Sequence, residues 1–331
     1  MGVNVINELK AGIVGKNRTI VFPEGDDKRI IFATEKLHKE GIVKPILLGD
    51  KDKILQIAKE NGVDLTGVEI FNPVEDERFE VLVDKFVELR KGKATREQAL
   101  EIIKDSNYFG TMLVQEGYAD GMVSGACHST GETVRPALQI IKTRPGVSKT
   151  SGAMIMLGKG GEKFLFADVA INIDITDKEM AEIAVVSAET AKIFGIEPRV
   201  AMLSFSTNGS ASSPEQEKAS NATKLAKKLV EEQGLDLPID GEMQFDAAIA
   251  PEVGQLKFPG SKVAGNATVF VFPELQSGNI GYKIAQRLGG YEAIGPILQG
   301  LNKPVNDLSR GCNAEEVYKT AIVTAAQVVE K

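Results

Sequence analysis

The residues best suited to chemistry lie near the C-terminus, in the run from Asn306 through Ser309 and Arg310 to Cys312. This run places a hydroxyl, a guanidinium and a thiol in a short arc. The residues after it, up to Glu316, are typical of a helix start and add a carboxylate. A hydroxyl can hydrogen-bond a carbonyl oxygen, and a guanidinium can bind phosphate. Alone, the run could be a turn that opens a helix; beside three similar loops it is the best candidate reaction centre.

The first of those loops, residues 125–131, contains Ser129 and Thr130. Free N–H groups at a helix start bind anions, so the loop is a candidate phosphate site. Pro136 suits the first position of the following helix, which would put Arg135 beside the helix N-terminus. A capped turn with a surface arginine is the alternative.

The second and third loops each allow two interpretations. Residues 204–212 include Ser206 and Thr207 and lead into Ser213-Pro214, which predicts a helix start. Residues 273–279 include Asn279, and Lys283 and Arg287 follow one helical turn apart on one face. Ligand contact competes with helix capping in the second loop and with solvated surface charge in the third.

Strands and helices must alternate to position these loops. Short apolar runs followed by helical patterns predict a parallel α/β sheet with helices on both faces, whose ligands bind at the carboxyl ends of the strands. The expected strands are 19–22, 45–48, 68–71 and 121–124, with helices at 26–40 and after Asp50.

A second series begins near Lys149. The apolar runs 152–157 and 163–167 are joined by a short glycine-rich link and predict a hairpin. A helix is expected over 177–194, strands over 200–204 and 268–272, and a last helix over 314–329. Because the hairpin interrupts a parallel pattern, we predict a first α/β domain of residues 1–148 plus 297–331 and a second of residues 149–296.

Composition narrows the class of function. The chain has 331 residues and a net charge of -7, so a general attraction to nucleic acid or to an anionic membrane is not expected. Two cysteines are too few for a disulfide scaffold and favour a cytoplasmic protein. With only two histidines, and no phosphate loop of the G-x-x-x-x-G-K-[ST] type, we expect no metal site and no tightly bound cofactor. Binding of Mg²⁺ by carboxylates alone stays open.

Several longer motifs then occur in order along the chain. They are 125–130 with 133–138, 269–275 with Gly278-Asn279, 293–300, and Lys303-Pro304-Val305-Asn306-Asp307-Leu308-Ser309-Arg310-Gly311-Cys312. Together they resemble the phosphate acetyltransferases (phosphotransacetylases) over essentially the whole chain. The resemblance implies reversible transfer of an acetyl group between acetyl phosphate and coenzyme A, with coenzyme A as a substrate.

The resemblance also implies a fold and a partner. It implies two α/β/α domains with an interdomain cleft, akin to the isocitrate and isopropylmalate dehydrogenases. It further implies a homodimer, and metabolic coupling to an acetate kinase.

Residue roles follow from the resemblance by position. Ser309 is expected to hydrogen-bond the acyl carbonyl, and Arg310 to stabilise phosphate charge. Arg90 and Arg135 match arginines that contribute to coenzyme A binding. To these we add the loop residues as hypotheses: Lys283 and Arg287 for coenzyme A, and Ser129, Thr130, Ser206, Thr207 and Asn279 for acetyl phosphate.

One position departs from the family pattern. Seven residues after the serine, where the family has an aspartate that deprotonates the thiol, this chain has Glu316. An ordinary carboxylate and an ordinary thiol differ by about 4 pKa units, so this proton transfer is uphill unless the site is desolvated. We therefore expect Glu316 to be partly desolvated.

Four alternatives remain open on sequence grounds. Cys127 or Cys312 could carry the acyl group covalently, although small cysteines in such turns are more often packing residues. The acyl group could be longer, such as butyryl. The chain could be a non-catalytic acetyl-CoA-sensing module, which would need a partner enzyme domain. A metal-dependent dehydrogenase of the same fold would need an acidic metal cluster that the sequence does not suggest.

Overall fold

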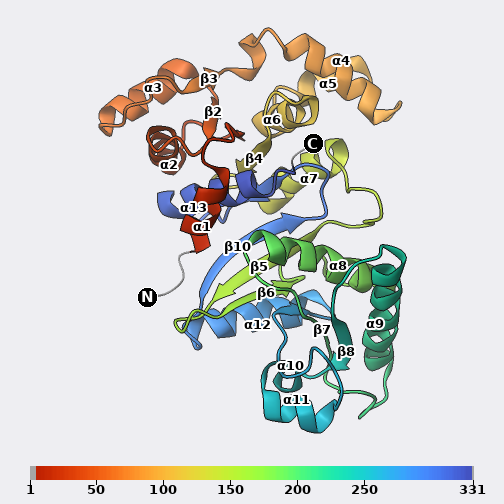
Figure 1. The fold of residues 1–331 in the computed structure, drawn as a ribbon. Coiled ribbons are helices and arrows are strands. Elements are labelled where there is room, and N and C mark those ends of the chain that lie inside the picture. The colour runs from red at the N-terminus through yellow and green to blue at the C-terminus, as the bar shows by residue number, and fades with distance from the viewer. Residues whose placement is uncertain (1–4, 330–331) are drawn as a thin grey trace. The chain divides into compact units, whose positions relative to one another are not determined.

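The chain folds into two compact units, seen in a computed structural model that describes residues 5–329 (Figure 1). We name the units by their place in the sequence: the central unit is Arg144–Gly300, with Val5 added. The flanking unit is Ile6–Thr143 together with the chain from Leu301 onward. The domain limits expected from sequence, 148/149 and 296/297, lie a few residues from these boundaries and stay a prediction. Their ends at 1–4 and 330–331 lie outside the described residues.

The flanking unit is built on a five-stranded sheet in the order β11-β4-β1-β2-β3. Every neighbouring pair in it is parallel, as the strand–helix alternation predicts. The strands are short and mostly buried: β1 (Thr19–Phe22), β2 (Lys44–Leu48), β3 (Glu69–Phe71), β4 (Gly121–Ser124) and β11 (Val305–Asp307).

Helices cover both faces of this sheet. Val21 and Met122 point into a core with Phe109 and Leu113 of α6, while helices α2 and α13 pack against each other and the sheet. The helices of the unit are α1 (Val5–Ile13), α2 (Lys28–Lys39), α3 (Lys51–Glu60), the 3₁₀ turn η1 (Pro73–Glu75), α4 (Phe79–Arg90), α5 (Arg96–Ile102), α6 (Ser106–Glu116), α7 (Thr130–Ile140) and α13 (Ala314–Ala326).

The central unit has a six-stranded mixed sheet in the order β10-β5-β6-β9-β7-β8. The hairpin predicted from sequence is confirmed: β5 and β6 pair antiparallel, and β10 adds antiparallel at the edge. The other pairs are parallel. The strands are β5 (Ser151–Leu157), β6 (Lys163–Ala167), β7 (Val200–Leu203), β8 (Ile239–Met243), β9 (Val269–Val271) and β10 (Glu292–Gln299).

Five helices complete the central unit. α8 (Asp177–Ile193) is mostly buried and packs along α9 (Pro214–Glu232), which Ser213 caps as its sequence predicts. α12 (Leu275–Arg287) differs, because Gly278 is its one buried residue. The remaining helices, α10 (Phe245–Ile249) and α11 (Pro251–Lys257), are short.

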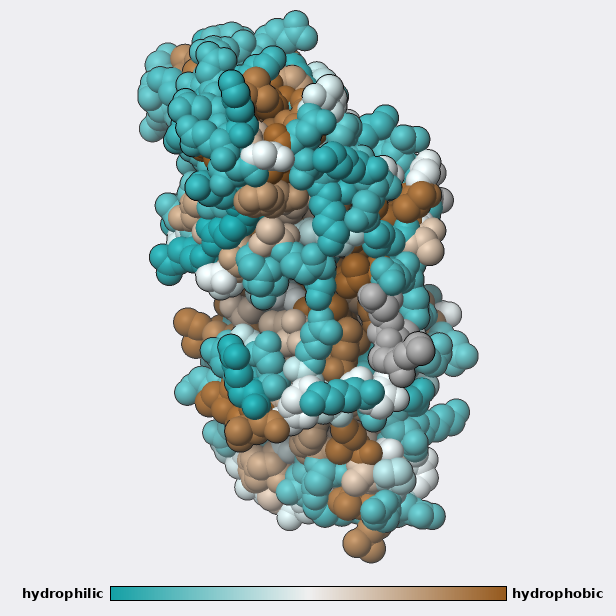
Figure 2. All heavy atoms as spheres, turned by 90° about the vertical axis from the view of Figure 1, so that its left-hand side faces the viewer, coloured by the Kyte–Doolittle hydropathy of each residue, from teal (hydrophilic) through white to brown (hydrophobic). Residues whose placement is uncertain are grey.

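The surface is mixed in polarity. On the face shown in Figure 2, hydrophilic side chains predominate and hydrophobic ones form separate patches. Among residues 5–329, no helix has both the length and the apolar character needed to cross a bilayer.

Candidate active site

The reaction loop connects the end of β11 to the start of α13 in the flanking unit. Ser309 and Arg310 are both exposed on it. The loop turns back on itself, because the N–H of Gly311 donates to Ser309 Oγ at 3.2 Å and the N–H of Cys312 donates to the Ser309 carbonyl at 2.8 Å. The two side chains expected to contact the acyl phosphate are thus presented by an ordered turn.

Glu316 lies in the first turn of α13, where it caps its own helix. Its Oε2 accepts from the N–H of Asn313 at 2.9 Å, and Asn313 Oδ1 accepts from the N–H of Glu316 at 3.0 Å. This reciprocal pair satisfies two N–H groups at the helix start. Glu316 is exposed. The third helical position directs the carboxylate at the helix end, and the expected desolvation in a closed cleft stays a prediction.

Arg29, at the start of α2, holds the reaction loop in place. Its guanidinium donates to the carbonyls of Arg310 at 2.7 Å and Cys312 at 3.1 Å. It also donates to the carbonyl of Ala126 at 2.8 Å, so one side chain joins two loops. Asp27 orients the guanidinium through two bonds of 2.8 and 2.9 Å. Burial opposes ionisation of Asp27, but hydrogen bonds from Arg29 and Cys127 outweigh it and lower the pKa to about 2.

The loop after β4 binds an internal carboxylate. Glu24 is buried and accepts from the N–H groups of Gly125 (3.1 Å), Ala126 (2.8 Å), Cys127 (2.7 Å) and His128 (3.0 Å). The Nδ1 of His128 lies 2.7 Å from the same carboxylate. The N–H groups of residues 125–128 therefore bind Glu24 and not a ligand, whereas anion binding at the rest of the loop, where α7 begins, stays a prediction.

Helix α7 begins earlier than its proline suggests. It starts at Thr130, with Ser129 and Glu132 forming the cap, and Pro136 lies inside it. Arg135 is therefore exposed in mid-helix and not beside the N-terminus, so that expectation is wrong. The capping pair of Ser129 and Glu132 fixed the start, and the hydroxyl of Ser129 donates to that same Glu132 at 2.7 Å.

Thr130 and the reaction loop are joined by Asp307, the last residue of β11. The Thr130 hydroxyl donates to Asp307 Oδ2 at 2.7 Å. Asp307 is buried, and this burial raises its pKa to about 6, against hydrogen bonds that favour the ionised form. Thr130 is thus linked through Asp307 to the strand end from which the Ser309 loop begins.

The two arginines predicted to bind coenzyme A lie around one tyrosine. Burial raises the pKa of Tyr108, while the nearby charges of Arg135 and Arg90 counteract the rise. The hydroxyl of Tyr108 donates to Gln139 Oε1 at 3.2 Å, and its ring packs edge-on against Phe86. Arg90, at the end of α4, and Arg135, on α7, are thus brought to one part of the flanking unit.

In the central unit, the hydroxyls of Ser206 and Thr207 are buried and bonded within the protein. Ser206 donates to Glu242 at 3.0 Å, and Thr207 accepts from the N–H of Gln244 at 2.9 Å. Both therefore brace the end of β8. Their contact with acetyl phosphate stays a prediction.

The other predicted residues of the central unit, Asn279, Lys283 and Arg287, all lie on α12. Asn279 donates to the carbonyl of Val169 at 3.0 Å and accepts from Lys283 at 2.7 Å. Lys283 and Arg287 are exposed. Their roles in ligand binding also stay predictions.

The surroundings of both thiols raise their pKa. Partial burial and the neighbouring Asp27 carboxylate raise the pKa of Cys127 to about 11, and burial raises the pKa of Cys312. The thiolate is the nucleophile in cysteine chemistry, so neither environment favours a covalent acyl carrier. In the part of the chain that the structure describes, no three His, Cys, Asp or Glu side chains gather as metal ligands.

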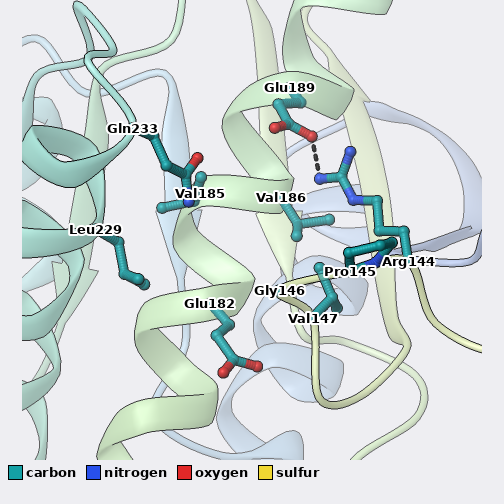
Figure 3. A pocket seen from close by; sticks show the side chains of 10 residues that line it. All are labelled: Arg144, Pro145, Gly146, Val147, Glu182, Val185, Val186, Glu189, Leu229 and Gln233. Atoms are coloured by element: carbon teal, nitrogen blue, oxygen red, sulfur yellow. Dashed lines mark hydrogen bonds and ion pairs between the residues drawn. The ribbon is translucent and has the colours of Figure 1, made fainter.

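A cavity of about 220 Å³ in the central unit contains none of the predicted site residues (Figure 3). It lies beside α8, where Arg144 pairs with Glu189 and the carboxylate of Glu182 accepts from Ser148. Its lining residues are Arg144, Pro145, Gly146, Val147, Glu182, Val185, Val186, Glu189, Leu229 and Gln233.

Three residues that organise the site were not found from sequence: Glu24, Arg29 and Asp307. Glu24 and Arg29 act on segments about a hundred or more positions away, so no local pattern marks them. A carboxylate that ends a buried strand directly before the Ser309-Arg310 pair was the available signal for Asp307.

Comparison with known proteins identifies one family over nearly the whole chain. Residues 4–325 match the family model described as phosphate acetyl/butaryl transferase. Phosphate acetyltransferases of Staphylococcus epidermidis and Staphylococcus aureus are 56% identical over 328 and 327 residues, covering 99% of this chain and of each relative.

Solved structures give the same result. A phosphotransacetylase from Streptococcus pyogenes is 56% identical, covers 100% of both chains and has a TM-score of 0.97. The EutD phosphotransacetylase from Staphylococcus aureus, also 56% identical, has a TM-score of 0.94 with 98% of each chain covered. A branched-chain phosphotransacylase from Enterococcus faecalis, at 19% identity and a TM-score of 0.66 over 95% of this chain and 100% of its own, shares the fold. This chain belongs to the phosphate acetyl/butaryl transferase family.

Proposed function

We propose that the protein is a phosphate acetyltransferase, which transfers an acetyl group reversibly between acetyl phosphate and coenzyme A. The observation that carries the proposal is full-length similarity to proteins named for this activity, at 56% identity over 99% of the chain. The presented Ser309-Arg310 turn supports it, because it offers a hydroxyl and a guanidinium to one ligand.

The reaction needs a thiolate, a donor at the carbonyl oxygen and positive charge at the phosphate. In our proposal the thiol sulfur of coenzyme A attacks the acetyl carbonyl directly, and the carbon–oxygen bond to phosphate breaks as inorganic phosphate leaves. Ser309 donates to the carbonyl oxygen and Arg310 stabilises the phosphate. Glu316 takes the thiol proton; only its Oε2 is used in the helix cap.

Binding roles complete the assignment. Arg90 and Arg135, which both lie near Tyr108, bind coenzyme A, with Lys283 and Arg287 as further candidates. Thr130 contacts acetyl phosphate, and the further candidates for this contact are Ser129, Ser206, Thr207 and Asn279. No tightly bound cofactor takes part, and coenzyme A acts as a substrate.

The remaining expectations belong to the same proposal. We propose a cytoplasmic homodimer, coupled in metabolism to an acetate kinase. We also propose a two-domain architecture with an interdomain cleft, like that of the isocitrate and isopropylmalate dehydrogenases. Two compact units, each with its own sheet, support the two-domain part.

The test is turnover of acetyl phosphate by the purified protein with coenzyme A, followed as acetyl-CoA formed and phosphate released. Propionyl and butyryl phosphates run alongside, because the family model covers both acetyl and butyryl transfer. We expect the highest kcat/KM with acetyl phosphate. A preference for butyryl phosphate would make the protein a butyryltransferase, and no turnover of any of the three would favour the acetyl-CoA-sensing module.

A further inference from the structure

Asp307 occupies an unusual position beside the reaction loop. It lies two residues before Ser309 and is buried. One of its oxygens, Oδ2, accepts from Thr130, whereas the other, Oδ1, is buried without a well-formed hydrogen bond. The Thr133 hydroxyl and the N–H of Leu308 lie near the carboxylate and only weakly favour its ionised form. A buried carboxylate oxygen without a donor is costly, and such groups in native proteins call for an explanation.

The elements packed around Asp307 compensate its charge only in part, because burial outweighs the hydrogen bonds from Thr130, Thr133 and the N–H of Leu308. From the loop after β4, Gly125 lies so close that an added Cβ would meet Oδ1 at 2.4 Å. From α7, the hydroxyls of Thr130 and Thr133 face it. The charged neighbour is Glu24, which carries the same sign as Asp307 and pairs with His128. Arg29 is committed to Asp27 and to backbone carbonyls.

Thr130 connects the buried carboxylate to the surface, because Thr130 is exposed while Asp307 is not. A hydroxyl has one proton to donate. We propose that Asp307 is a positioning residue whose protonation decides whether Thr130 offers acetyl phosphate a donor or only an acceptor. The inference rests on the proposed function, and it names the regulation of one binding contact of that site.

The two states follow from simple hydrogen-bond counting. When Asp307 is ionised, Thr130 spends its proton on Oδ2 and presents lone pairs, which repel phosphate oxygens. When a proton from solvent binds to Oδ2, Asp307 donates to Thr130 Oγ1, and the Thr130 hydroxyl is released to donate to a phosphate oxygen. An incoming phosphate anion therefore favours uptake of one proton by Asp307.

The expected size follows from the protonated fraction. With a pKa of about 6, that fraction falls from about one half at about pH 6 to about one hundredth at about pH 8. The affinity for acetyl phosphate should therefore weaken by about 10- to 50-fold over this interval. Acetyl phosphate is a suitable probe because its acyl group makes it a stronger acid than a phosphate monoester, so its own charge stays constant.

The experiment is calorimetric titration of the full chain with acetyl phosphate, without coenzyme A, in pairs of buffers that differ in ionisation enthalpy. Wild type should take up nearly one proton on binding at about pH 7, and its affinity should fall as pH rises. Asp307→Asn should show neither effect. Thr130→Ser, which keeps the hydroxyl, should show both, and Thr130→Val should bind weakly without proton uptake.

The outcomes separate this inference from the proposed function. If wild type turns over acetyl phosphate but Asp307→Asn keeps the proton uptake, the inference is overturned, because a group other than Asp307 then takes up the proton. If Asp307→Asn does not fold, the Thr130 pair decides alone, and proton uptake by Thr130→Val would refute the proposal. A purely structural role would leave the pH dependence of binding unchanged in both variants.

Discussion

Among single residues, Glu316 has two roles: its carboxylate caps α13, and it is also the proposed base. Glutamine at this position can still form the capping pair, so Glu316→Gln separates the two duties. We expect turnover to fall by about 10²- to 10⁴-fold, as for loss of a general base, with the free energy of unfolding changed by less than about 1 kcal/mol.

Steady-state kinetics and urea unfolding check this prediction together. Glu316→Ala is the comparison, because it removes the cap as well and should lose about 1 kcal/mol of stability. Near-normal turnover in Glu316→Gln would remove Glu316 from the mechanism and leave its role as a helix cap.

Asp307 also predicts how stability depends on pH. Its pKa of about 6 lies above the ordinary value of about 3.9, so the native chain binds this proton more tightly than the unfolded chain. The contribution of Asp307 to stability is therefore full below about pH 4 and is lost as pH rises to about 6.

Asp307→Asn has no charge to bury, so it should not lose stability as the pH rises from about 4 to about 6. The variant should gain up to about 3 kcal/mol of stability relative to wild type between about pH 4 and about pH 7. Urea unfolding of both proteins across this range measures the difference. A variant that is less stable by the same amount at every pH would show instead that Asp307 acts through packing alone.

The cysteines allow a third test at this scale. Since both thiol pKa values are raised, we expect the double variant Cys127→Ala, Cys312→Ala to keep activity within about threefold, and initial rates to show a ternary complex. Trapping of an acetyl group on either sulfur, or parallel double-reciprocal lines, would contradict direct transfer.

At the scale of elements, Glu24 joins β1 to the loop that follows β4. Its carboxylate accepts hydrogen bonds from four backbone N–H groups. In Glu24→Gln the side-chain NH₂, which is a donor, would face some of these N–H groups and could not accept from them. We expect a loss of about 2–4 kcal/mol in stability and faster hydrogen exchange in residues 125–128. Peptides from α9 serve as an internal control. Unchanged exchange over 125–128 would show that the loop orders itself without the carboxylate.

Elements with strong local patterns were predictable from sequence. The apolar runs 19–22 and 121–124 are β1 and β4, and the helix expected over 177–194 is α8. β10 was not predicted, because Gly295-Pro296 interrupts its apolar pattern. The structure accommodates this pair at the sheet edge, where the register shifts between Ile294 and Ile297.

The site was predictable only in part, for a related reason. Ser309 and Arg310 stand in a recognisable local run, but their supports do not. Arg29 reaches the reaction loop across 281 positions, and only the parallel order β11-β4-β1 brings these segments together. Helix starts were misjudged where two signals competed, as when the Ser129–Glu132 cap prevailed over Pro136.

At the scale of the whole molecule, the proposed homodimer needs a surface to bury. α12 offers one, because Ile280, Ile284 and Leu288 recur at one-turn spacing and are 56%, 53% and 85% exposed. Three large aliphatic side chains in one exposed row are more typical of an interface than of a solvated helix. Around the helix, Lys283 lies about 60° from Ile280 and Arg287 lies about 60° from Ile284, so both charges border the row.

We therefore expect the double variant Ile284→Asp, Leu288→Asp to weaken dimerisation by at least about a hundredfold, because buried unpaired carboxylates cost several kcal/mol. Sedimentation velocity over a range of concentrations measures the change. Leu256→Asp is the matched control, since Leu256 is 81% exposed on α11 and should leave the dimer intact. A double variant that remains dimeric would place the interface elsewhere, whereas a monomeric wild type would refute the homodimer itself.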